Sequence, residues 1–337
     1  MRLLTIGENE AGQRLDRFLE KYMNQAPKSF FYKMLRKKNI TLNGKRAEGK
    51  ERLLPGDEVR LFLADETIDG FSSHSGKSGK EKAAELLPGE LTPEILYEDA
   101  HVILFNKPAG LLSQKAEADD ISLVEYLTSY LLESGQLTEN ALRSFRPGIC
   151  SRLDRNTSGL VAAGKSLRGL QELNLLFRER SLHKYYRSIA AGAVEKPVRA
   201  EGWLLKDERT NQVRVFRERR GKARPICTEY RPLSVFTLEG RPYTYLEINL
   251  ITGRSHQIRA HLSSLGHPLI GDGKYGSART NELFRKKFRL NYQLLHAYRL
   301  EFPKLSGALS EISGRTFTAP LPPVFEEILQ AAGTASR

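Results

Sequence analysis

The sequence has little of what would stabilise a small secreted domain or cross a membrane. It contains two cysteines, Cys150 and Cys227, far apart and outside any CxxC pair, which argues against a disulfide framework and a thiolate zinc site. No apolar run approaches the roughly 18 residues that a membrane helix needs, and the N-terminal apolar stretch is too short for a signal peptide. We therefore expect a soluble protein of a reducing cytoplasm.

Acidic residues are also scarce relative to basic ones. Lysine and arginine total 53 against 40 aspartates and glutamates, which gives a formal charge of +13 and a pI near 9.6. This surplus favours a polyanionic partner, most often nucleic acid, because neutralising phosphates releases condensed counterions. Excess charge for solubility alone remains the alternative unless the charges cluster.

The chain is long enough for two domains. Serine, glycine and charge dominate residues 65–90, which predicts a flexible linker. The linker would join a small unit, residues 1–64, to a larger one, residues 91–330. Helical and strand-like stretches alternate irregularly in the larger unit, so the expected class is α+β.

The N-terminal unit concentrates positive charge. Phe30, Phe31, Met34 and Leu35 recur with the spacing of one helix face, and the pair at 43–44, Asn-Gly, predicts a tight turn between short strands. This region predicts an RNA- or DNA-binding surface, with an ordinary solvated face as the alternative. The basic residues of this proposed surface are Lys28, Lys33, Arg36, Lys37, Lys38, Lys45 and Arg46.

One acidic residue stands out in the larger unit. The stretch SRLDRNTSGL places Asp154 between Arg152 and Arg155, just before the apolar run LVAAG. A helix with Ser166 as N-cap should follow this run. Asp154 is therefore expected on a loop that enters a strand, where catalytic groups concentrate. The alternative is a structural carboxylate that ties two arginines to the loop.

The same segment contains a misleading pattern. Residues 159–166, GLVAAGKS, match the phosphate-binding G-x-x-x-x-G-K-[ST] pattern. A phosphate loop requires a strand before the first glycine, whereas the residues there are polar and the intervening ones are core-type. Nucleotide hydrolysis using Lys165 is therefore disfavoured.

Two further segments carry candidate site residues. Residues 183–192 alternate like a strand, with Tyr186 on one face. Residues 255–265 predict a helix that buries Leu265 and exposes Arg259 on its polar face. The histidines of this region are spaced wrongly for a shared metal ion, so no metal site is predicted; they are His256, His261 and His267.

Together these segments resemble the RluA-type RNA pseudouridine synthases from about residue 92 to 325. The matching motifs are ILYEDAHVILFNKPAG, SRLDRNTSGLVAAGKS, KYYRSIAAG, LITGRSHQIRAHLSSLGHPLIGD and LLHAYRLEFP. Residues 12–63 resemble the RNA-binding fold of ribosomal protein S4. The resemblance implies an α+β protein: an S4-like domain followed by a catalytic domain on a mixed, mainly antiparallel sheet flanked by helices.

The resemblance also implies the chemistry, isomerisation of uridine to pseudouridine in structured RNA without a cofactor. It makes Asp154 the essential aspartate, acting as nucleophile or as base, and Tyr186 the aromatic that stacks on uracil. Arg259 would pair with the aspartate, with Arg254 as a near rival. Ser151 replaces the family's usual histidine. The other residues implied to contact the substrate are Arg152, Arg155, Arg254, His256 and Gln257.

The identity of the RNA is left more open. An S4-like domain favours large-subunit ribosomal RNA, with transfer RNA as an alternative target. A catalytically silent RNA-binding protein is the alternative from another class. The basic segment 213–224 is either a target-selecting insertion or a hairpin with a solvated face. Nothing in the sequence requires a protein partner, and a monomer is expected.

Overall fold

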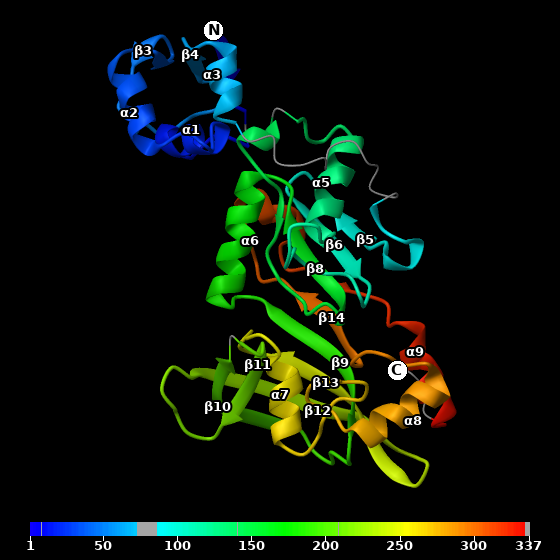
Figure 1. Cartoon of the computed structure of the whole chain (residues 1–337). Helices are drawn as coiled ribbons and strands as arrows, with labels where there is room; N and C mark the ends of the chain where they lie inside the picture. The colour runs from blue at the N-terminus through cyan, green and yellow to red at the C-terminus, as the bar shows by residue number, and fades with distance from the viewer. Residues whose placement is uncertain (8, 73–85, 140, 208, 334–337) are drawn as a thin grey trace.

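The chain folds into two units, which Figure 1 shows end to end. This computed structural model describes residues 1–7, 9–72, 86–139, 141–207 and 209–333. Among the helices in these ranges, none is both long and apolar enough to span a membrane.

The N-terminal unit packs three helices on a small sheet. Its strand order is β1-β4-β2-β3. Phe31, Met34 and Leu35 are buried as the helical spacing predicts, and positive φ angles at Asn43 and Gly44 close the turn between β2 and β3. The elements are β1 (Arg2–Thr5), α1 (Leu15–Tyr22), α2 (Lys28–Arg36), β2 (Ile40–Leu42), β3 (Lys45–Arg46), β4 (Glu58–Leu61) and α3 (Asp65–Gly70).

The segment predicted as a linker, residues 65–90, is too long at both ends. Helix α3 buries Ile68 in the N-terminal core, and Ser72 Oγ donates to the carbonyl of Tyr22 at 3.0 Å. At the other end Leu87 is buried in the core of the larger unit. The polar composition of the window concealed these apolar anchors. The central part, residues 73–85, lies outside the described residues.

The larger unit is built on one long sheet, in the order β11-β10-β12-β13-β9-β14-β8-β6-β5. Among the described strands every pair is antiparallel except β14 with β8, so the expected mixed, mainly antiparallel sheet is confirmed. The strands are β5 (Glu94–Glu98), β6 (Val102–Lys107), β7 (Gly148–Ile149), β8 (Ser158–Gly164), β9 (His183–Ala191), β10 (Val198–Asp207), β11 (Gln212–Phe216), β12 (Arg224–Leu238), β13 (Arg241–Leu250), β14 (Leu295–Glu301) and β15 (Thr316–Thr318).

Helices flank this sheet, and local sequence signals begin two of them. Ser122 forms a capping box at the start of α5, and Ser166 Oγ accepts from the amide of Gly169 at the start of α6. The helices are α5 (Leu123–Glu133), α6 (Leu167–Glu179), α7 (Gln257–Ser264), α8 (Ala278–Phe288) and α9 (Pro323–Ala331), with short 3-10 turns η1 (Gly89–Leu91), η2 (Ala141–Arg143) and η3 (Gly307–Ile312).

The residues that match the phosphate-loop pattern form a strand instead of a loop. Residues 159–164 lie within β8, where every residue is buried and pairs with β6. Lys165 is buried, and its ammonium donates to Glu98 and to the carbonyl of Asp99. A buried strand cannot wrap its amides around a phosphate, so the match is accidental.

Polar contacts join the two units near the N-terminal end of α6. Ser144 Oγ donates to Glu10 Oε1 at 2.7 Å, and Arg143 Nη1 lies 3.3 Å from Asp69 Oδ1. Helix α6 extends from this junction along the larger unit (Figure 1). Its 13 residues span roughly 20 Å at 1.5 Å per residue, so the two ends of α6 lie at different parts of the molecule.

Candidate active site

A pocket of about 630 Å³ opens where α7, the loop before β8, the start of β9 and the C-terminal end of α6 meet. It gathers residues that are far apart in the sequence. Those predicted for the site and found in its lining are Arg152, Asp154, Tyr186, Arg254, His256, Gln257 and Arg259. Arg155 is not among them: its side chain is exposed, and its Nε donates to the carbonyl of Gly110 at 3.1 Å. The structure places Arg155 outside this lining, and its substrate contact stays a prediction.

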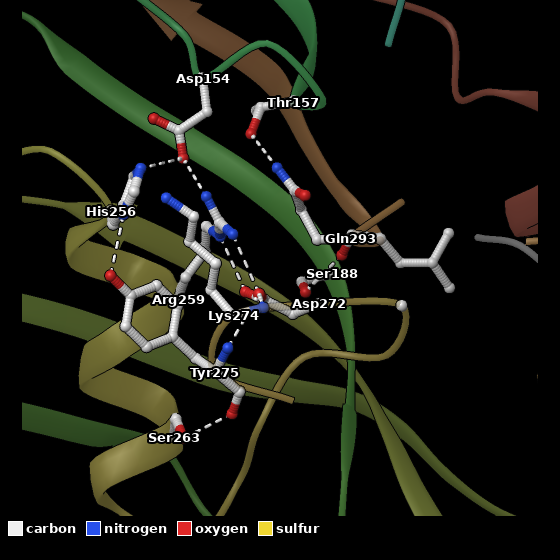
Figure 2. Close-up of polar contacts among 12 residues, drawn as sticks. Asp154, Thr157, Ser188, His256, Arg259, Ser263, Asp272, Lys274, Tyr275 and Gln293 are labelled. Carbon is white, nitrogen blue, oxygen red and sulfur yellow. Dashed lines mark hydrogen bonds and ion pairs between the residues drawn. The ribbon is translucent and has the colours of Figure 1, made fainter. Parts of the chain in front are cut away.

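Asp154 is held by one arginine that bridges two carboxylates (Figure 2). Arg259 Nη1 donates to Asp154 Oδ2 at 2.8 Å. On its other side Arg259 makes a bidentate pair with Asp272, with Nε–Oδ2 at 2.7 Å and Nη2–Oδ1 at 2.9 Å. The Asp272 side chain is completely buried, whereas that of Asp154 is 28% exposed. Asp272 thus holds Arg259 in place, and Arg259 orients Asp154 toward the pocket.

The ion pair between Arg259 and Asp154 bears on the alternatives that the sequence left open for Asp154. In the described structure neither Arg152 nor Arg155 pairs with Asp154, so the carboxylate does not tie these neighbours to the loop. Arg259, and not Arg254, makes the ion pair.

The predicted faces of the helix at 255–265 are wrong at two residues. Arg259 was expected on an exposed face but is buried, and Leu265 was expected in the core but is 43% exposed. The helix proper, α7, ends at Ser264, which leaves Leu265 as the C-cap. Arg259 is buried because Asp272 and Asp154 compensate its charge, a condition that periodicity does not reveal.

Asp272 was not singled out from the sequence. Burial alone would raise the pKa of this carboxyl, but the hydrogen bonds and charge of Arg259 outweigh burial and lower it. The backbone amides of Lys274 and Tyr275 also donate to Asp272, at 2.9 and 3.1 Å. Its only sequence signal is its position as the last letter of the quoted motif, thirteen residues after Arg259.

Tyr275 links several parts of the site. Its hydroxyl lies 2.8 Å from His256 Nδ1 and accepts the backbone N–H of Val213 at 3.0 Å. Its ring centroid is 5.3 Å from the guanidinium carbon of Arg259. His256 in turn places Nε2 3.9 Å from Asp154 Oδ2. Burial lowers the pKa of His256, which favours a neutral imidazole beside the carboxylate (Figure 2).

Tyr186 lies on β9 and lines the pocket with Asp154. Its side chain is buried, and burial together with the negative charge of Asp154 raises the pKa of its hydroxyl. The phenol therefore stays protonated at neutral pH. Tyr186 offers a flat aromatic face and a hydroxyl donor next to the carboxylate.

Gln257 lines the pocket, but its amide makes its hydrogen bonds inside the protein. The residue is 2% exposed. Its Nε2 donates to the carbonyl of Cys227 at 3.1 Å and to Thr228 Oγ1 at 3.0 Å, and its Oε1 accepts from Thr252 Oγ1 at 2.9 Å. The side chain thus fastens the start of α7 to β12, and the substrate contact of Gln257 stays a prediction.

Lys107 is a second residue that sequence reasoning missed. It is fully buried, and its ammonium donates to the carbonyls of Pro108, Leu111 and Arg155 at 2.8 to 3.0 Å. Burial lowers the pKa of Lys107 to about 7, against the opposing effect of the Asp154 charge. Lys107 therefore fixes the backbone immediately after Asp154.

The three histidines weighed for a metal have separate partners. His261 is buried with Nδ1 3.0 Å from Thr228 Oγ1, and His267 Nδ1 lies 3.1 Å from the carbonyl of Ala191. Within the described ranges no group of three histidine, cysteine, aspartate or glutamate side chains is placed to hold a metal ion.

The basic surface predicted on the N-terminal unit is solvent-facing. All seven of its basic residues are exposed, on α2 and on the strands and turns that follow it. Lys28 alone among them makes an ion pair, with Glu20 at 3.4 Å, in the part of the chain that the structure describes. The remaining charges are available to a polyanion.

The basic segment 213–224 is not a hairpin. Strand β11 pairs with β10, and the chain then crosses to β12 on the other side of β10. Arg219 stacks over Trp203 at 5.7 Å and Arg220 over Phe216 at 4.9 Å. These two arginines therefore hold the connection against the sheet.

Comparison with known proteins agrees with this architecture. Residues 101–264 match the RNA pseudouridylate synthase family and residues 13–59 match the S4 domain. The ribosomal large subunit pseudouridine synthase C of Vibrio cholerae is 31% identical over 90% of this chain and 89% of that protein. Its counterpart in Pasteurella multocida is 31% identical over 98% and 94%.

A solved structure shows the same fold. Human RNA Pseudouridylate Synthase Domain Containing 4 aligns with 72% of this chain and 94% of its own, with a TM-score of 0.56 and 22% sequence identity. The chain thus belongs to the RNA pseudouridylate synthase family and has an S4 domain ahead of the catalytic domain. The resemblance of its motifs to the RluA type is confirmed, and it is an RNA pseudouridine synthase.

Proposed function

We propose that this enzyme isomerises uridines of large-subunit ribosomal RNA and that Asp154 starts the reaction. The observation that carries the proposal is the position of Asp154. It is the only carboxylate among the described residues that line the pocket, and Arg259 orients it toward the cavity.

The chemistry requires little beyond these groups. Isomerisation breaks the bond between N1 and C1′, turns the base and joins C5 to C1′, and the hydrogen on C5 leaves as a proton. No electrons are gained or lost overall. A carboxylate can begin this sequence either by attacking the sugar or by removing a proton from it. Arg259 holds the carboxylate of Asp154 in position in both cases.

The surroundings of Asp154 suit an extruded nucleotide. A paired base cannot reach a carboxylate within a pocket, so the uridine must leave its stack. Tyr186 supplies an aromatic surface for the uracil, and His256 lies beside the carboxylate. Arg152 and Arg254 line the same pocket and would contact the flanking backbone.

Two observations support the ribosomal target. The relatives from Vibrio cholerae and Pasteurella multocida are ribosomal large subunit enzymes by name. The S4 domain presents an exposed basic helix, α2, which suits a folded RNA with dense phosphates.

We further propose that the enzyme acts as a monomer in the cytoplasm, because one chain supplies the pocket residues and both cysteines are unpaired thiols.

The test measures loss of the C5 hydrogen. RNA labelled with tritium at uracil C5 would be prepared from cells that lack this gene and incubated with the purified protein, and tritium in water would be counted. Wild type should release tritium from large-subunit RNA, and Asp154→Asn should release none while binding RNA within a few-fold of wild type.

Other outcomes separate the alternatives. Release from transfer RNA alone would replace the proposed target. Tight binding to both RNAs without release from either would indicate a catalytically silent RNA-binding protein. Loss of RNA binding by Asp154→Asn would show that this residue is structural.

A further inference from the structure

Lys184 is a half-buried cation at the pocket. It is the second residue of β9 and lines the pocket. Its ammonium makes no hydrogen bond or ion pair with any described residue. It lies so close to Gly253 that a Cβ on this glycine would be 3.3 Å from Nζ. An ammonium that lines a cavity and has no partner among the described residues is available to pair with an anion that enters the cavity.

Arg180 adds a second positive charge at the same place. It is the C-cap of α6, in the left-handed conformation with φ 58° and ψ 35°, which is uncommon for a residue other than glycine. Its side chain also lines the pocket. Burial, and then the nearby charge of Arg180, lower the pKa of Lys184. Two like charges this close repel each other, and an anion between them would relieve the repulsion.

The position of Lys184 relative to Tyr186 identifies the kind of anion. The two residues are two positions apart on β9, so their side chains emerge on the same face of the sheet, about 7 Å apart along the strand. A single nucleotide spans this separation when its base lies against Tyr186 and its phosphate against Lys184. Both residues belong to the motif KYYRSIAAG, in which only Tyr186 was given a role.

We propose that Lys184 and Arg180 form a subsite for the phosphodiester next to the target uridine. The proposal rests on the proposed function, in which this uridine occupies the pocket. The subsite lies at the C-terminal end of α6, whereas the S4 domain contacts the region of the N-terminal end (Figure 1). It therefore anchors the RNA near the reacting base, separately from the basic surface of the S4 domain.

The experiment measures the salt dependence of RNA binding for four variants of the full chain, of which Lys184→Arg is the conservative one. Lys184→Gln and Arg180→Gln should weaken binding and make the slope of log K against log salt shallower by roughly 0.7 each, as expected for one lost contact to single-stranded RNA. Lys286→Gln is the matched control, because Lys286 is exposed on α8 and outside the pocket lining. The slope for this variant should equal that of wild type.

A merely structural lysine would behave differently. If Lys184 only packed against Gly253, its replacement would leave the salt slope unchanged, and Lys184→Arg would not restore binding. The proposal expects Lys184→Arg to keep the wild-type slope, because the positive charge is retained. An unchanged slope in both Lys184→Gln and Arg180→Gln would overturn it.

Inorganic phosphate tests whether the subsite also accepts a free anion. At constant ionic strength, exchanging chloride for phosphate should weaken RNA binding by wild type more than by Lys184→Gln. Equal weakening of both proteins would count against a phosphate subsite. Tritium release by wild type is measured in parallel. An inactive wild type would refute the proposed function, whereas the salt slopes of RNA binding would still test the phosphate subsite.

Discussion

Replacing Asp272 by asparagine removes the charge behind Arg259 while preserving the shape of the side chain. Arg259 would retain only Asp154 as its counter-charge. Removing one partner of a buried ion pair costs about 3 to 5 kcal/mol, and we expect about 3 kcal/mol because Asp154 still compensates part of the charge. For a domain of this size a loss of 1 kcal/mol lowers Tm by about 2 to 4 °C, so Tm should fall by roughly 6 to 12 °C.

The same substitution should impair catalysis. Without Asp272 the guanidinium is no longer held at two edges, so Asp154 loses the support that orients it toward the pocket. A loss of about 1.4 kcal/mol in transition-state stabilisation is a tenfold rate decrease, and we expect kcat to fall by at least this amount. RNA affinity should change little, because Asp272 is buried and does not line the pocket.

The dependence of stability on pH provides a sharper signature. The folded protein lowers the pKa of Asp272 below its ordinary value of 3.8. A lowered carboxyl pKa contributes stability that is fully present above the unfolded value and is lost as pH falls through the folded one. Wild type should therefore lose stability below pH 3.8 more steeply than Asp272→Asn, measured by calorimetry across this range.

Glu282→Gln is the matched control for this substitution. It is the same change from carboxylate to amide, on a residue of α8 whose side chain is 42% exposed and pairs with Arg285 and Lys286. Exposed pairs contribute little, so Tm and kcat should stay at their wild-type values. If Asp272→Asn also kept the wild-type Tm, kcat and acid response, the reasoning that Asp272 holds Arg259 for catalysis would be refuted.

Two further substitutions test other parts of the site. Tyr275→Phe removes the hydroxyl that contacts His256 and Val213. One neutral hydrogen bond is worth about 1 kcal/mol, so the rate of tritium release in a single turnover should fall about fivefold while RNA affinity stays unchanged. An unaltered rate would show that this hydroxyl does not position the imidazole. Replacing three basic residues on and after α2 by glutamine should weaken RNA binding and reduce the slope of log K against log salt by roughly 2. The value of kcat at saturating RNA should be retained. A wild-type slope would show that this surface is not part of the RNA interface. The changed residues are Lys33, Arg36 and Lys37.

Local features of the chain could be predicted from the sequence because neighbouring residues produce them. The helix caps Ser122 and Ser166 act within one turn of their own helices. The turn at Asn43 and Gly44 closes with the positive φ angles that these residue types tolerate. The alternation of residues 183–191 assigned Tyr186 to one face of a strand, and Tyr186 does face the pocket. Asp154 was likewise expected on a loop entering a strand.

The linker shows where composition misled. Its polar residues outnumber the apolar ones, yet Ile68 and Leu87 are each buried in a different core. Composition averages over a window, whereas packing depends on single side chains.

The sequence by itself determined the fold class, the family and the presence of an aspartate, a tyrosine and arginines in the site, because periodicity, turn residues and motif order are properties of the linear chain. Only the tertiary structure decided how these groups are connected. Asp154 and Arg259 are 105 positions apart, and their contact depends on how the sheet and α7 pack. The same packing buries Asp272 behind Arg259, turns the amide of Gln257 inward and places Lys184 at the pocket. These relations follow from which distant segments meet, and local sequence does not contain that information.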